Sequence, residues 1–91
     1  MLNLILIKDG EGFCEEFGYL AGLTISETSS GYIGLFKCCD KQDNLKEDKR
    51  PELFSVEIMF GEDIIILDNL KIQYIDQFNH VHFFGYKTVK I

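Results

Sequence analysis

Apolar and polar residues alternate along much of this chain, which is the pattern of β-strands that turn one side toward a core. The clearest example is residues 53–60, where every second residue from Val56 to Phe60 is apolar. These residues fall on one side because successive side chains of a strand point in opposite directions. A turn at 61–63 and a continuous apolar run at 64–67 follow, so the sequence predicts a β-hairpin here.

Four further segments have strand patterns, although their faces differ. Residues 2–7 are apolar on both sides, which favours a strand in the middle of a sheet that ends at Asp9-Gly10. Residues 70–75 alternate and favour a strand, with a helix as the alternative. The other predicted strands are the aromatic-rich 32–38 and a last strand, 80–91, that is broken or bulged at Gly85.

One segment has helical spacing instead. Phe13, Phe17 and Leu20 stand at positions i, i+4 and i+7 within residues 12–22, as in an amphipathic helix that faces a core. Asp9 is placed to cap its first turn. Its three glycines each weaken a helix by about 1 kcal/mol relative to alanine. The sequence still predicts a short helix in this segment.

Residues 40–50 form the longest polar stretch, and Leu45 is its one apolar residue. This composition ahead of Pro51 favours an exposed hairpin loop between two strands, and we expect this loop to be the mobile segment of the chain. Shorter polar segments predict a loop and turns at 26–31, 68–69 and 76–79.

These elements predict an α+β fold, mostly an antiparallel β meander or small barrel of five to six strands with one short N-terminal helix. A chain of 91 residues builds one core, so residues 1–91 are expected to form a single domain. The hydrophobic content of 46% is that of a globular protein.

The charge is acidic and unevenly distributed. Fifteen acids and nine bases give a net charge of −6, which argues against free nucleic acid or an anionic membrane as a partner. Residues 9–36 and 51–76 each carry a net charge of −5, whereas residues 37–50 carry +1. Two acidic stretches of this kind favour association with a basic protein, although a charged surface also serves solubility.

The three cysteines predict free thiols rather than a disulfide framework. Their number is odd, and the adjacent Cys38 and Cys39 have strained geometry for a bond to each other. The first residues lack the basic leader of a secretory signal, and no apolar run approaches the roughly 20 residues of a membrane span. A cytoplasmic location is expected.

Candidate chemistry is sparse. His80 and His82 fall on the same side of a strand, where two imidazoles can bind one metal ion. A metal needs further ligands, which Cys14, Cys38 or Cys39 would have to supply. None of these cysteines has the C-x-x-C spacing of a recognised metal site. Phosphate-binding loops, dinucleotide-binding glycine motifs and nucleophile motifs are missing as well. We therefore expect no enzyme activity, no metal and no cofactor.

Part of the chain resembles the LAGLIDADG homing endonucleases. Residues 17–23 read FGYLAGL, and a GYIGL segment at 31–35 and the strand sequence PELFSVEIMF follow. The resemblance implies a helix that ends in metal-binding acidic residues, with a sheet behind it that lies in a DNA groove. Here TISETSS replaces the acidic end, with Glu27 as its one acid, so the resemblance implies a degenerate relative without nuclease activity.

The favoured function is a non-catalytic protein-binding module, an acidic inhibitor or immunity-type protein that blocks the basic surface of a toxin or nucleic-acid-handling enzyme. The alternative is a small structural subunit of a viral or other assembly, which would pair with its neighbours through the edge of its long last strand. Tyrosines 19, 32, 74 and 86 are candidate interface anchors. The residues expected to bind the partner are Glu11, Glu15, Glu16, Glu27, Glu57, Glu62, Asp63 and Asp68.

Overall fold

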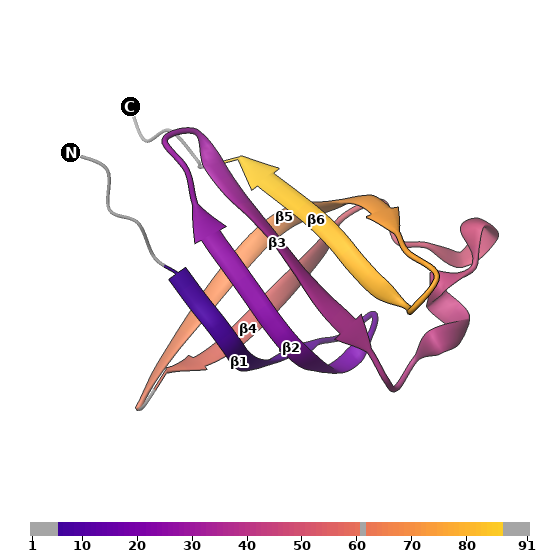
Figure 1. Cartoon of the computed structure of the whole chain (residues 1–91), viewed down its shortest axis with the longest axis horizontal. Helices are drawn as coiled ribbons and strands as arrows, with labels where there is room; N and C mark the ends of the chain where they lie inside the picture. The colour runs from indigo at the N-terminus through magenta and orange to yellow at the C-terminus, as the bar shows by residue number, and fades with distance from the viewer. Residues whose placement is uncertain (1–5, 61, 87–91) are drawn as a thin grey trace.

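The chain folds into a closed antiparallel β-barrel (Figure 1). The computed structural model describes residues 6–60 and 62–86, and for residues 6–11, 60 and 63 it describes the backbone only. Around the barrel the strand order is β1-β2-β3-β6-β5-β4, and β4 pairs with β1 to close the circle. The strands are β1 (Leu6–Cys14), β2 (Gly18–Glu27), β3 (Gly31–Cys38), β4 (Phe54–Phe60), β5 (Asp63–Ile75) and β6 (His80–Tyr86).

The predicted α+β class is wrong, because the described chain is all-β apart from two short 3-10 helices, η1 (Gln42–Leu45) and η2 (Glu47–Lys49). The segment predicted as a helix is a β-hairpin. Cys14 ends β1 and pairs with Gly18 at the start of β2, which leaves residues 15–17 as the turn. The strand predicted to end at Asp9-Gly10 instead continues through that point with register shifts on either side of Gly10.

The hairpin buries two of the three apolar residues that suggested a helix. Phe17 and Leu20 are buried, but Phe13 faces outward and its ring packs edge-on against Tyr19 at 5.3 Å between centroids. Gly18 has a φ of +81°, which glycine adopts without strain and which reverses the chain after the turn. Residues 17–23 therefore belong to a turn and a strand, so the helix that defines the LAGLIDADG family is absent from this part of the described chain.

Residues 39–53 form a crossover rather than the predicted hairpin loop. β3 pairs with β2 and β6, whereas β4 pairs with β1 and β5, so this connection crosses one end of the barrel. Both 3-10 helices lie in it, and they stand at the opposite end of the molecule from the tip of the β4–β5 hairpin (Figure 1). Leu45, the apolar residue of this polar stretch, is buried against the core.

The predicted hairpin over residues 53–67 is confirmed by the antiparallel pairing of β4 with β5. The predicted turn at 68–69 is wrong, since β5 runs through it. Asn69 has a φ of 56°, and the β4–β5 register shifts between Phe54 and Val56 at the same level. β5 pairs mainly with β4 before this bulge and with β6 after it, so residues 70–75 are part of a strand, as predicted.

The last strand is regular and has a neighbour on each side. β6 pairs with β3 without a register shift, so the bulge predicted at Gly85 is wrong: Gly85 lies opposite Tyr32. On its other side β6 pairs with β5. The turn predicted at residues 76–79 is present between these two strands. The predicted strand segments 2–5 and 87–91 lie outside the described residues.

Four phenylalanines form the centre of the core. Phe17, Phe36, Phe54 and Phe83 are at most 2% exposed, and their rings contact one another at centroid distances of 5.6 to 6.1 Å. Aromatic pairs in this edge-on or tilted arrangement add about 0.5–1.5 kcal/mol each beyond the burial of their area. The centre of the barrel is thus occupied by rings from β3, β4, β6 and the turn after β1, and buried side chains of β1, β2 and β5 pack around them.

No helix among the described residues is long and apolar enough to cross a membrane.

Candidate functional site

A row of outward-facing side chains crosses four neighbouring strands. Tyr19 of β2 lies opposite Phe13 of β1, and Phe13 lies opposite Glu57 of β4. Glu57 lies opposite Ile66 of β5. Directly opposed residues of antiparallel strands share one side of the sheet, so these four side chains form one continuous line on the surface.

A second row next to it is apolar. Met59 lies opposite Ile64 near the tip of the β4–β5 hairpin, and these side chains are 66% and 59% exposed. Tyr19 is 71% exposed and Ile66 54%. Exposed apolar side chains gathered on one surface are typical of interaction sites, whereas single ones need no explanation.

A pocket of about 380 Å³ with several carboxylates in its wall lies along the first row, on the side away from the second row. A second hollow of about 360 Å³, bordered by Tyr19 and Met59, adjoins it, and Phe13 and Glu57 line both. We call the first hollow the acidic pocket, and it is lined by Phe13, Glu15, Glu16, Ser55, Glu57, Ile66 and Asp68. We call the pocket and the two rows together the acidic–apolar face.

The acidic pocket exists because β1 turns away from β4. After Cys14 the chain reverses so that Phe17 can fill the core, and Glu15 and Glu16 are left on the turn. The crossover holds this turn from behind. Lys41 Nζ donates a hydrogen bond to the backbone carbonyl of Glu15 (2.7 Å), and Asn44 Nδ2 donates one to that of Glu16 (2.6 Å).

The carboxylates of the pocket are not neutralised by the protein itself. Within the described residues, Glu15, Glu16, Glu57 and Asp68 form no ion pair with lysine or arginine. Asp68 accepts a hydrogen bond from the hydroxyl of Ser55 (2.7 Å) across the two strands. A pocket with several unpaired carboxylates creates a local negative potential that attracts cationic groups.

The structure brings together four of the eight residues predicted to bind a partner: Glu15, Glu16, Glu57 and Asp68. Glu27 lies at the far end of β2 and Glu62 at the β4–β5 turn, so neither lines the pocket. The side chains of Glu11 and Asp63 lie outside the described residues. The pocket draws on both acidic stretches of the sequence.

Cys14 is buried beside this pocket and is unreactive. Its burial and the hydrogen bond from its Sγ to Glu16 Oε2 (2.9 Å) raise the pKa of Cys14 to about 12. A thiol attacks as the thiolate, so this cysteine remains protonated and non-nucleophilic at neutral pH. The hydrogen bond also holds the Glu16 carboxylate near the wall of the barrel.

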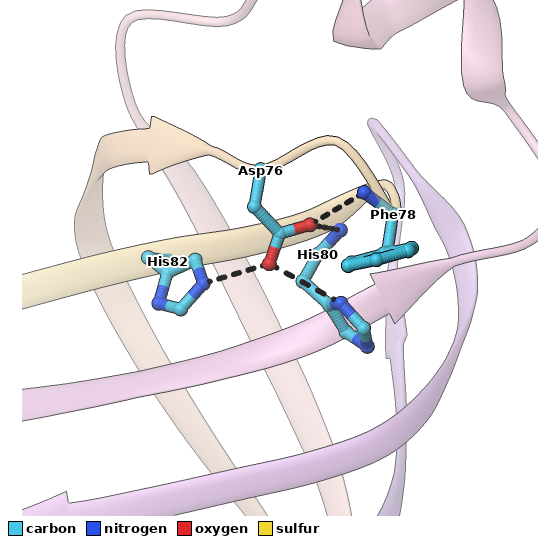
Figure 2. A network of polar contacts seen from close by, with 4 residues as sticks. All are labelled: Asp76, Phe78, His80 and His82. Atoms are coloured by element: carbon cyan, nitrogen blue, oxygen red, sulfur yellow. Dashed lines mark hydrogen bonds and ion pairs between the residues drawn. The ribbon is translucent and has the colours of Figure 1, made fainter.

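A second polar cluster lies in the turn between β5 and β6, where Asp76 accepts three hydrogen bonds and lies within ion-pair distance of His80 (Figure 2). Its Oδ1 accepts from the backbone N–H groups of Phe78 (2.9 Å) and His80 (3.0 Å). Its Oδ2 accepts a hydrogen bond from His82 Nε2 (3.2 Å) and lies 3.3 Å from His80 Nδ1, an ion pair when His80 is protonated. The ring of Tyr74 stacks on His82 with 4.1 Å between centroids.

This network stabilises the ionised form of Asp76. Desolvation alone would raise the pKa, but the hydrogen bonds from the His80 backbone, the His82 side chain and the Phe78 backbone, together with the charge of His80, lower the pKa of Asp76 from 3.8 to about 2. A folded-state pKa below the unfolded value means that the unfolded chain binds more protons in acid. The resulting stability is present above about pH 4 and is lost as the pH falls toward 2.

We therefore expect Asp76→Asn to flatten the acid limb of the stability curve. Between pH 4 and 2 the free energy of unfolding of the wild type should fall more steeply than that of the variant, because the variant lacks the ionisation that links folding to pH. Urea unfolding at several pH values in this range measures the slope. Asp48→Asn, an exposed carboxylate with no contact to a histidine, is the matched control. Equal slopes for wild type and Asp76→Asn would contradict the assignment.

The two histidines lie on either side of the Asp76 carboxylate and point to it rather than to a common empty position (Figure 2). Cys14 and Cys38 are buried, and Cys39 is exposed. In the part of the chain that the structure describes, no three histidine, cysteine, aspartate or glutamate side chains are arranged to hold a metal ion. The histidines instead hold the β5–β6 turn in place.

Sequence reasoning missed the apolar half of the face and the role of Asp76. Because side chains alternate along residues 53–60, Met59 falls on the same side as Ser55 and Glu57, and this position was the available signal that it points outward. Ile64 and Ile66 sit in a continuous apolar run that hides which residues face out. Asp76 looked like an ordinary turn residue, although an aspartate with two histidines four and six positions later is a detectable pattern.

Comparison of the chain with known protein families, with curated proteins and with solved structures finds no match.

Proposed function

We propose that this protein is a non-catalytic binding module that uses the acidic–apolar face to cover a basic surface of another protein, as an inhibitor or immunity-type protein does for a toxin or a nucleic-acid-handling enzyme. The observation that carries the proposal is the row Tyr19, Phe13, Glu57 and Ile66, which runs beside a pocket whose four carboxylates form no ion pair within the described residues. The apolar and acidic components of a protein interface meet on the same surface.

The two components have different roles in binding. Burial of the exposed aromatic and aliphatic side chains supplies most of the affinity, and it acts without regard to charge. The carboxylates select a basic partner, because complementary fields accelerate its approach and like charges repel wrong partners. Desolvation of the pocket on binding strengthens each ion pair that forms across the interface.

The alternative of a structural subunit has less support. It rested on an unpaired edge of the last strand, but β6 has a hydrogen-bonded neighbour on each side. The aromatic residues of β6 also have partners within the barrel. Phe83 fills the core, and the rings of Phe84 and Tyr86 pack against each other at 5.8 Å between centroids.

The proposal includes a reducing compartment such as the cytoplasm. All three cysteines are free thiols, and Cys39 is exposed. An exposed thiol persists where cellular reductants keep it reduced, which supports the proposed location.

The test is affinity capture with two charge-reversed variants followed by titration of the captured protein. Glu57→Lys reverses the central charge of the face, and Glu47→Lys makes the same change in η2, away from the pocket. We expect the wild type and Glu47→Lys to capture the same basic protein at low salt. Glu57→Lys should bind it about 30-fold more weakly, since loss of one member of a desolvated charge pair costs about 2 kcal/mol or more.

Salt gives an independent readout. Raising the ionic strength from about 0.05 M to 0.5 M should weaken capture by the wild type, because exposed charges are screened beyond the Debye length. The proposal fails if no basic protein is captured, if capture is indifferent to salt, or if Glu57→Lys binds as tightly as Glu47→Lys.

A further inference from the structure

The barrel closes through a very short seam. Among the described residues, β1 and β4 pair at two positions, Gly12 with Ile58 and Phe13 with Glu57. β4 pairs with β5 from Phe54 to Phe60, by contrast. The first part of β4, residues 54–56, therefore has a strand on its β5 side and no described strand on its β1 side.

This open edge borders the acidic pocket. Continued pairing would bring Cys14 opposite Val56 and Glu15 opposite Ser55, but Cys14 pairs with Gly18 and the chain turns away. The space left beside β4 is lined by Glu15 and Glu16 on one side and by Ser55 on the other. The edge of β4 at residues 54–56 thus borders a pocket in which four of the seven lining residues are carboxylates.

An extended chain that paired with this edge would be constrained on both of its faces. Its outward side chains would lie beside Glu57, Asp68 and the carboxylates of the turn, so they must be basic. Its inward side chains would approach Phe54 and Val56, which are at most 2% exposed and closely packed. Little room exists there, so these side chains must be small and apolar.

We propose that the partner contributes an extended segment, with basic residues alternating with small apolar ones, that adds as a strand to the β1-facing edge of β4 at residues 54–56 and places its basic side chains in the acidic pocket. The inference rests on the proposed function and specifies how the acidic–apolar face is used. Main-chain hydrogen bonds to the edge would give affinity, and the alternating side chains would give specificity.

The occupant follows from charge and geometry together. The acidic pocket selects cations, and an open strand edge selects an extended backbone, because only that conformation presents its N–H and C=O groups in register. A basic helix would satisfy the charge and leave the edge unused. The ladder is short, since Glu57 is already paired with Phe13.

The experiment uses the full chain and synthetic probes. The first probe is a short, acetylated and amidated peptide in which arginine alternates with alanine. The second probe has the same sequence with the backbone amides of every other residue N-methylated, and the third has the remaining set of amides N-methylated instead. We call these two patterns the two N-methylated phases. One N-methylated phase removes the donors that face β4, so it should bind at least about tenfold more weakly than the parent, whereas the other phase should bind like the parent.

Two further measurements locate the strand. Binding of the parent peptide should slow hydrogen exchange of backbone amides in residues 54–56, and Asp68→Lys should weaken binding while Glu47→Lys does not. Failure of the parent peptide to bind overturns the inference. So does equal binding of both N-methylated phases and the parent, or protection confined to other strands.

The outcomes separate this inference from the proposed function. If the peptides bind in a salt-dependent way that Glu57→Lys abolishes but N-methylation leaves unchanged, the face binds basic partners without strand addition, and the inference alone is wrong. If the wild type captures no basic protein in the variant experiment above, the proposed function fails whatever the peptides do.

Discussion

Phe36→Ala is expected to cost about 3–5 kcal/mol in the free energy of unfolding, the range for removal of a fully buried phenylalanine. Phe36 contacts Phe17, Phe54 and Phe83, so one substitution removes three ring contacts and leaves a cavity at the centre of the barrel. A domain of this kind has a free energy of unfolding of about 5–15 kcal/mol, so this one substitution removes a large part of it. The melting temperature should fall by more than about 10 °C.

Urea unfolding checks this expectation. The midpoint should decrease while the slope with urea stays close to that of the wild type, because the surface exposed on unfolding is nearly unchanged. Phe78→Ala is the matched control, since Phe78 is 63% exposed in the β5–β6 turn and its loss should cost within about 0.5 kcal/mol. Similar costs for the two variants would show that the four-ring cluster does not form the core.

Gly31→Ala should destabilise the barrel by about 3 kcal/mol, more than its single added methyl group would suggest. A Cβ at residue 31 would overlap the backbone carbonyl of Gly85 and lie 2.9 Å from the Cα of Tyr86. These are backbone atoms of the neighbouring strand, so no side-chain rotation relieves the contact. β3 and β6 would have to separate at the point where Gly31 pairs with Tyr86.

Gly22→Ala separates this steric effect from backbone strain. A Cβ at Gly22 meets nothing within 4 Å, but its φ of +61° is unfavourable for alanine by about 1–2 kcal/mol. Thermal and urea unfolding of both variants should rank Gly31→Ala as the more destabilising. The reverse order would mean that β3 and β6 are not as closely paired at this end as the structure shows.

Local patterns predicted the elements that local chemistry controls. Residues 53–60 alternate strictly, and a turn of glycine and acidic residues follows them. This pattern predicts a hairpin, which β4 and β5 form. The turn at residues 76–79 was predictable for the same reason, since Asp76 both starts it and accepts the backbone N–H groups that define it.

Where the local sequence is compatible with two structures, the contacts with the rest of the barrel determine which one forms. A helix would turn Phe13, Phe17 and Leu20 to the core, whereas the hairpin buries only Phe17 and Leu20. The neighbouring strands favour the hairpin, because β4 pairs with Phe13 and Phe17 packs on Phe54. Likewise, Asp68-Asn69 has the composition of a turn, but β5 is needed on both sides of it, to pair with β4 and then with β6. A bulge at Asn69 lets β5 change its pairing from β4 to β6 without ending the strand.

Alternation and composition alone predict a strand-rich, acidic chain whose negative charge is concentrated in two stretches. That these two stretches meet follows from the fold, because the pairing of Phe13 with Glu57 that closes the barrel brings together residues far apart in the chain. Closure depends on how six strands share one core, which no local spacing records. The acidic pocket is a consequence of that closure, and so is the outward position of the apolar side chains beside it.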